Sequence, residues 1–355
     1  MKKLILSALL ILALLAAGCV KPAPYEEHLA DYVKTLPYED GFVILHLSDL
    51  HWGNSTEIQG AKEMLTGIID ETLAHKGHIN LIVLTGDQFL TGNMKTVRTL
   101  IDTLESYGIP YAPVWGNHDQ HGLYNPEWLS NEFRKAPHSQ YVEFFDDLPG
   151  RSNYLIHLTE DGTKDTPVRW QLAFFDSGVG SIETTFTVSS SYGAISEEQA
   201  AWWKAEHDLV GEEVPVVAFY HVIEGDMVAA SRAIQNGAEL KNRFFLHEQF
   251  CNADAETSHF FDIAKNHGLR AAFFGHDHAN DWVVDYEGVT LGYGVKSGYE
   301  LYYTEITDTE AYTYGFQDGF DLTGAAVVTL HDGTEMELEH LYLNPQNDFT
   351  GWVVY

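Results

Sequence analysis

The chain has 355 residues and carries 20 Lys and Arg against 52 Asp and Glu, which gives a formal net charge of −32. Hydrophobic residues make up 45% and aromatic residues 13%, enough for a large core, so a disordered chain is excluded. So acidic a chain lacks the basic face that nucleic-acid binders need, and its 2 Cys are too few for a disulfide scaffold or a cysteine zinc module. Its 18 His are almost as many as its basic residues.

The first segment is typical of an export signal. Two lysines precede an apolar run, Leu4 to Ala17, that is shorter than the roughly 20 residues of a membrane-spanning helix. We therefore predict a signal peptide over residues 1–18. Cys19 directly follows Ala-Ala-Gly, an order that resembles the lipobox of bacterial lipoproteins. The resemblance implies a lipid on Cys19, a tether over residues 19–40, and an extracytoplasmic, membrane-anchored protein; ordinary cleavage with a secreted product is the alternative.

Short apolar runs alternate with helical patterns along the rest of the chain. The runs typical of buried strands are 42–48, 79–85, 111–115, 154–158, 171–176, 214–221, 270–275 and 289–294. The helices expected are 58–76, 94–107, 196–209 and 256–267, with a capping box at Ser196 and Gln199. The last stretch, 325–355, is typical of a β meander. Because such alternation indicates a largely parallel α/β sheet and no linker splits the chain, we expect a single domain over residues 41–355 with a C-terminal β-rich portion.

Side chains of the types that bind metals follow five of these predicted strands. They are Asp49 and His51, then Asp87, then Asn117 with His118 and Asp119, then His221, then His276 and His278. Sites in α/β sheets gather at the carboxyl ends of strands, so we expect these side chains to lie together. In an extended Asp-x-His or His-x-His the outer side chains point the same way, so each pair is expected to serve one site.

These residue types indicate metal chemistry. Carboxylates, imidazoles and one amide without thiolate suit Mn, Fe or Zn, and they are too many donors for one tetrahedral ion. Asp87 can bridge two ions, and two ions about 3.5–4 Å apart clamp the attacking and leaving oxygens of a displacement. We therefore expect two divalent metal ions. Glycines beside Asp87, Asn117 and His276 allow the sharp turns that convergence needs.

The order of these clusters resembles a known family. Asp-x-His, Gly-Asp, Gly-Asn-His-Asp, a lone His and Gly-His-x-His form the five-block signature of the calcineurin-like metallophosphoesterase superfamily. Tyr192-Gly193 and the run from Gly275 to Asp281 are similar to its purple-acid-phosphatase-like branch. The resemblance implies an α/β fold, a four-layer αββα sandwich of two mixed sheets, with the active site at the carboxyl ends of the strands.

The resemblance also implies a role for each position. One ion would be held by Asp49, His51 and His278, the other by Asn117, His221 and His276, and Asp87 would bridge them. His118 would be the general acid for the leaving oxygen, oriented by Asp119, with metal-bound hydroxide as nucleophile. True purple acid phosphatases place a Tyr three residues after the bridging Asp, where this chain has Leu90. This difference favours Mn, Zn or Fe(II) over a coloured ferric centre.

We therefore predict a binuclear metal-dependent phosphoester hydrolase that acts on a small phosphoester and has no nucleic-acid partner. A phosphodiesterase for cyclic nucleotides or phospholipid head groups is the alternative within this class. A non-catalytic lipoprotein that binds metal or ligand is the alternative outside it.

Several neighbours of the blocks have two interpretations. Trp52, His121 and Tyr124 line the pocket in one and are core or surface residues in the other. Asn280 and Asp281 either hold His278 or shape a turn.

Overall fold

The computed structural model describes residues 32–53, 58–90, 93–121, 126–143, 148–178, 193–225, 228–230, 233, 244–246, 259–278, 280–298, 323–344 and 349–355. The predicted signal peptide and Cys19 lie outside these ranges. Of the predicted tether, residues 32–40 are described, and Val33–Pro37 forms strand β1, which pairs in parallel with β5 (Tyr154–Thr159). The folded domain therefore begins ahead of residue 41.

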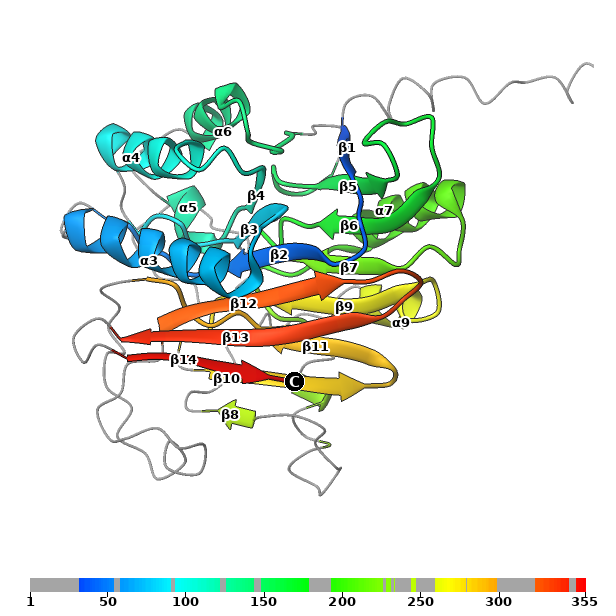
Figure 1. The fold of residues 1–355 in the computed structure, drawn as a ribbon. Helices are drawn as coiled ribbons and strands as arrows, with labels where there is room; N and C mark the ends of the chain where they lie inside the picture. The colour runs from blue at the N-terminus through cyan, green and yellow to red at the C-terminus, as the bar shows by residue number, and fades with distance from the viewer. Residues whose placement is uncertain are drawn as a thin grey trace, which may run out of the picture.

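One of two mixed sheets has eight strands, in the order β1-β5-β6-β7-β9-β11-β10-β8 (Figure 1). Its remaining members are β6 (Val168–Phe174), β7 (Val216–Phe219), β8 (Phe244–Leu246), β9 (Leu269–Phe274), β10 (Asn280–Tyr286) and β11 (Val289–Tyr293). The central strands β6, β7, β9 and β11 run parallel to one another. Their carboxyl ends therefore share one edge of the molecule.

The other sheet has six strands, in the order β14-β13-β12-β2-β3-β4. They are β2 (Phe42–Leu47), β3 (Leu81–Thr85), β4 (Tyr111–Val114), β12 (Thr323–Leu330), β13 (Met336–Asn344) and β14 (Phe349–Val354). β2 is buried at all six positions, as a strand covered on both faces must be. The predicted C-terminal meander is confirmed, and it extends this sheet because β12 pairs antiparallel with β2.

Helices cover the outer faces of both sheets (Figure 1). They are α3 (Ile58–Lys76), α4 (Met94–Glu105), α6 (Pro126–Lys135), α7 (Glu197–Val210) and α9 (Phe260–Ala264), while the short helix α5 (Asn117–His121) follows the carboxyl end of β4. Helix α3 contacts β2, β12 and β13, and α4 packs between α3 and α6. On the other side, Trp203 of α7 donates from Nε1 to Gln171 of β6 at 3.0 Å. The expected αββα layering is confirmed.

Local signals behave as expected at the helix starts. The capping box of α7 is present, with the Ser196 hydroxyl accepting from the backbone of Gln199.

Strand β10 and helix α6 have no counterpart among the predicted elements. In the described part of the chain, no helix is both long and apolar enough to cross a bilayer.

Candidate metal centre

All five polar clusters follow strands, as predicted. Asp49, Asp87 and Asn117 follow β2, β3 and β4 of the six-stranded sheet. His221 and His276 follow β7 and β9 of the eight-stranded sheet. The backbone N–H of His276 donates to Asp49 Oδ2 at 3.0 Å, which joins the two sheets at this end. The site therefore lies where the carboxyl ends of both sheets meet.

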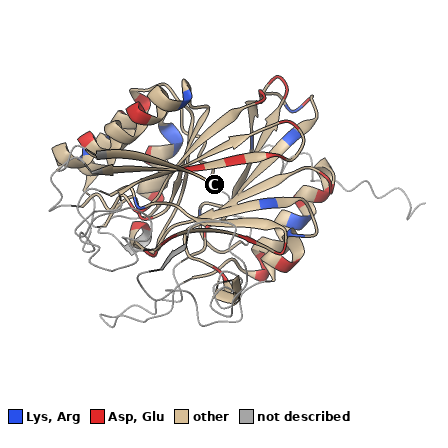
Figure 2. Cartoon of the chain, turned by 60° about the horizontal axis from the view of Figure 1, so that its bottom comes forward, with Lys and Arg blue, Asp and Glu red and all other residues tan. Residues whose placement is uncertain are grey.

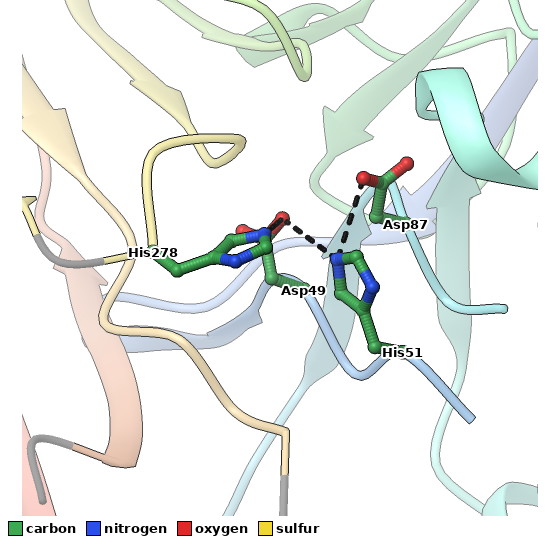
Figure 3. Close-up of side chains that lie close together, drawn as sticks. All are labelled: Asp49, His51, Asp87 and His278. Carbon is green, nitrogen blue, oxygen red and sulfur yellow. Dashed lines mark ion pairs between the residues drawn. The ribbon is translucent and has the colours of Figure 1, made fainter. Parts of the chain in front are cut away.

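Asp49, His51, Asp87 and His278 make up what we call the first group. Their ligand-type atoms lie within 4.8 Å of one another, and all four residues are buried (Figure 3). Asp49 Oδ1 lies 3.3 Å from His278 Nε2 and 3.7 Å from His51 Nε2, and His51 Nε2 lies 3.4 Å from Asp87 Oδ2. Two carboxylates and two imidazoles thus converge on a volume that one metal ion would fill.

Asp87, His221 and His276 make up a second group of the same kind, also buried and within 4.8 Å. Asp87 Oδ2 lies 3.3 Å from His221 Nε2, and Asn117 Oδ1 lies 3.1 Å from the same nitrogen. Asp87 belongs to both groups. The geometry is therefore that of two adjacent sites with one carboxylate in common.

The side chains converge through left-handed turns rather than through strand alternation. Asp49, His51, Asp87 and His276 have φ of 52°, 48°, 50° and 79°. Such values are uncommon for residues with a side chain, and Glu287 is the one other example among the described residues. Asp49 and His51 fall in one group, as predicted, whereas His276 and His278 fall in different groups, and strand alternation is not what brings these side chains together. Strain of this kind gathers at functional sites, where the surrounding structure maintains it.

Glycines beside the ligand-type residues leave room for close approach. A Cβ at Gly116 would lie 2.2 Å from Asp87 Oδ1, and one at Gly275 would lie 2.5 Å from Asp49 Oδ2. A Cβ at Gly86 would lie 2.5 Å from His221 Nδ1. Each glycine thus lets a neighbouring ligand-type side chain pass over the backbone.

The electrostatics of the site favour a cation. Burial would raise the pKa of Asp49 and Asp87, yet nearby imidazoles hold the pKa of both carboxyls well below its usual value. Burial alone would lower the pKa of His51, but the same two carboxylates raise it to about 9. Burial, with His221 adding to it, lowers the pKa of His276 to about 3. The carboxylates thus stabilise positive charge at their centre, which divalent ions supply.

The tautomer of His221 fits a metal as well. Its Nδ1 lies 2.7 Å from the carbonyl oxygen of Thr85, which can only accept, so Nδ1 carries a proton. In the neutral ring, Nε2 is then an acceptor and faces two others, Asn117 Oδ1 and Asp87 Oδ2. Asp87 Oδ2 is buried and accepts no hydrogen bond in the described part of the chain. Three acceptors converging in this way require positive charge among them, which a metal ion or a second ring proton supplies; burial opposes that proton, but Asp87 raises the pKa of His221 to about 10.

His118 and Asp119 differ from the other members of the site. The His118 side chain keeps 34% of its exposure, whereas the side chains of the first group keep 2% or less. Its backbone N–H donates to Asp87 Oδ1 at 2.8 Å. The Asp119 carboxylate accepts from the backbone N–H of Phe89 and of Gly116, both at 2.9 Å. These two hydrogen bonds join Asp119 to the loops that carry Asp87 and Asn117 rather than to the imidazole of His118. Burial together with Asp87 raises the pKa of Asp119 to about 8.

The neighbours with two interpretations are partly resolved. Trp52 is 1% exposed and therefore belongs to the core. Asp281 lies against His340 Nδ1 at 2.9 Å and accepts from the Tyr342 hydroxyl, so it joins β10 to β13. The side chain of His121 and all of Tyr124 lie outside what the structure describes. Sequence reasoning missed Ser48, whose hydroxyl donates to Asp49 Oδ2 at 2.5 Å.

Comparison with known sequences agrees with this geometry. The family model Calcineurin-like phosphoesterase matches residues 42–280. "Probable inactive purple acid phosphatase 29" of Arabidopsis thaliana is 24% identical over 334 residues, covering 81% of this chain and 79% of that protein. "Phosphatase DCR2" of Saccharomyces cerevisiae is 26% identical and covers 57% of this chain and 36% of that protein.

A solved structure supports the fold. A dimetal phosphatase from Danio rerio matches with a TM-score of 0.53 at 14% identity, covering 89% of this chain and 100% of that one. At this identity the likeness concerns the fold alone, whereas the matched family model spans all five blocks, from Asp49 to His278. The chain therefore belongs to the calcineurin-like phosphoesterase family, and it is a metallophosphoesterase, a metal-binding hydrolase of phosphoric esters.

Proposed function

We propose that this chain hydrolyses small phosphoesters with two divalent ions bridged by Asp87. The first ion would be held by Asp49, His51 and His278, and the second by Asn117, His221 and His276. The observation that carries the proposal is the sharing of Asp87 by two buried groups of ligand-type side chains. When bound, the ions would lower the pKa of water, neutralise phosphate charge and align the attacking and leaving oxygens.

Manganese, zinc or ferrous iron fits the ligand set. Position 90, three residues after Asp87, carries Leu, so no phenolate is available there for a ferric centre. Carboxylate and imidazole ligands accept all three ions, and metal supply decides among them in the cell.

His118 would protonate the leaving-group oxygen. Its side chain is part-exposed beside buried ligands, so it is reachable by a substrate, and Nε2 lies 3.9 Å from Asp87 Oδ2. Imidazole titrates near neutral pH and can release a proton at that point. Asp119 would act as a positioning residue, because it fixes the two loops that flank His118.

A pair of substrates tests the role of His118. Loss of a general acid costs about 10²–10⁴-fold, and an alkyl phosphate needs the proton more than p-nitrophenyl phosphate does. We expect His118→Gln to retain two metal ions and to lose far more kcat on the alkyl ester than on the aryl ester. His259→Gln is the matched control, since His259 is 78% exposed and belongs to none of the five blocks. Equal losses on both esters in His118→Gln would refute the role.

Asp87→Asn tests the bridge itself. The amide cannot serve two cations as a carboxylate does, so the variant should bind fewer than two ions and hydrolyse neither ester. Wild-type protein that binds two ions and hydrolyses no phosphomonoester or phosphodiester would favour the non-catalytic binding protein.

The plant relatives are named as inactive, whereas this chain has all seven ligand-type residues and His118 in place.

The charge of the chain favours small substrates over nucleic acid. Acidic positions are spread over helices and strand ends, with few basic ones between them (Figure 2). A net charge of −32 repels polyanions at long range, while ions at the site would attract a single phosphate locally.

We also propose that Cys19 carries a lipid that anchors the enzyme outside the cytoplasm. The support is the basic start, the apolar run and Ala-Ala-Gly before Cys19. Cys19→Ala should move the protein from the membrane fraction to the soluble fraction. A wild-type protein already soluble after export would contradict the anchor and leave a secreted enzyme.

A further inference from the structure

A histidine lies in the core between the two sheets, behind the metal centre. His46 of β2 is 0% exposed, and its ring centroid lies 5.8 Å from those of Phe219 and Phe273 on the opposite sheet. Leucine would fill such a position without polar atoms. A buried polar group costs about 1–3 kcal/mol unless it is hydrogen-bonded, so the choice of histidine calls for a partner.

That partner is the last residue of β3. His46 Nε2 lies 2.7 Å from Thr85 Oγ1, and Thr85 is itself fully buried. In the described part of the chain Nδ1 of His46 has no hydrogen-bond partner, so Thr85 is the one polar contact of the ring. His46 is opposite Val83 in the β2–β3 register, and Thr85 lies two residues on, so both side chains are on the same face.

Thr85 links this buried pair to the metal centre. While its hydroxyl contacts His46, its carbonyl oxygen accepts from His221 Nδ1 at 2.7 Å. The next two residues are Gly86 and Asp87, with φ of 94° and 50°, so the strained turn to the bridging carboxylate starts at Thr85. The orientation of Thr85 therefore sets both the ring plane of His221 and the start of that turn.

We propose that His46 and Thr85 are positioning residues for the second ion, acting through His221, and that His46 is more than a packing residue. The inference rests on the proposed function, since it assumes that His221 is a ligand of the second ion. Partners that orient a metal-binding histidine are worth about 10–100-fold in metal affinity. His46 acts through one more hydrogen bond, so we expect the lower end, about 10-fold.

Two conservative variants separate the hydrogen bond from packing. Thr85→Val removes Oγ1 but keeps the shape and the carbonyl that His221 contacts, and His46→Phe keeps an aromatic ring between Phe219 and Phe273. Zinc binding is measured by competition with a chromophoric chelator, and Asn117→Ala identifies which of the two binding steps belongs to the second ion. We expect about a 10-fold weaker second step and an unchanged first step in both variants. The double variant should lose no more than either single variant, because both remove one interaction.

His157→Phe is the matched control. His157 of β5 is 6% exposed and lies 3.1 Å from Gln171, in a part of the eight-stranded sheet that none of the five blocks follows. It should lower the melting temperature and leave both zinc affinities unchanged. If Thr85→Val and His46→Phe behave like this control, His46 only packs and the inference is overturned. Wild-type protein that binds fewer than two zinc ions overturns the proposed function as well.

Discussion

Replacing Gly116 by Ala should displace the carboxylate of Asp87, the proposed bridge, while every ligand-type residue stays unchanged. The added Cβ would lie 2.2 Å from Asp87 Oδ1 and 2.4 Å from the Asp87 backbone nitrogen. Non-bonded atoms settle near 3.5 Å, so one of the two loops must move by roughly 1 Å. Because the closest neighbours include backbone, rotation of a side chain cannot relieve the contact.

The size of the effect follows from that displacement. A shift of about 1 Å at a reacting centre can cost about 10²-fold in rate, and overpacking costs about 1–3 kcal/mol of stability. Asp87 Oδ1 also accepts from the His118 backbone, so the shift would move the proposed general acid too. We expect Gly116→Ala to lose about 10²-fold in kcat and to bind metal more weakly, measured by phosphatase assay and zinc competition.

Gly67→Ala is the control for the substitution itself. Gly67 lies within α3, and its Cβ would meet only Leu343 Cδ1, at 3.9 Å. Alanine in a helix is favoured over glycine by about 0.5–1 kcal/mol, so this variant should be slightly more stable and fully active. Wild-type metal affinity and turnover in Gly116→Ala would refute the close packing of these loops.

Three further predictions concern stability. Burial, with Lys164 adding to it, lowers the pKa of His157 to about 4, so the unfolded chain, with a pKa near 6.5, takes up the proton first as the pH falls. The free energy of unfolding, measured in urea, should therefore decrease by up to about 3 kcal/mol between pH 6.5 and 4. His157→Phe should lose this dependence; the same dependence of stability on pH in both proteins would contradict the lowered pKa of His157. A chelator should lower the melting temperature, because an ion at 100 times its Kd stabilises the native state by about 2.7 kcal/mol; an unchanged value means that no ion is bound. Asp119→Asn has one carbonyl oxygen for the N–H groups of Phe89 and Gly116 and should lose about 1–3 kcal/mol, with wild-type stability as the contrary result.

The elements that are predicted best from sequence are those that depend on residues near one another in the chain, such as apolar runs and helix caps. The apolar runs before Asp49, Asp87 and Asn117 are strands, and the capping box at Ser196 starts α7. Ligand-type residues directly after each strand were enough to place the site, because a strand fixes where its last residue lies.

Features that depend on distant residues were out of reach. Strand β1 lies in a segment with a composition typical of a tether, and its pairing with β5 joins Val33 to Leu155, far along the chain. Asp281 was interpreted from its neighbour His278, yet its partners His340 and Tyr342 come from β13. Neighbouring glycines predict turns at Asp87 and His276, but the left-handed φ falls on the ligand-type residues themselves, which are not glycines, and the pattern does not predict that.

Anomalous X-ray diffraction from crystals grown with zinc or manganese tests the binuclear centre most directly. We expect two anomalous peaks about 3.5–4 Å apart on either side of the Asp87 carboxylate, one beside His51 and His278 and one beside His221 and His276. A single peak, or two peaks that Asp87 does not bridge, would contradict this expectation.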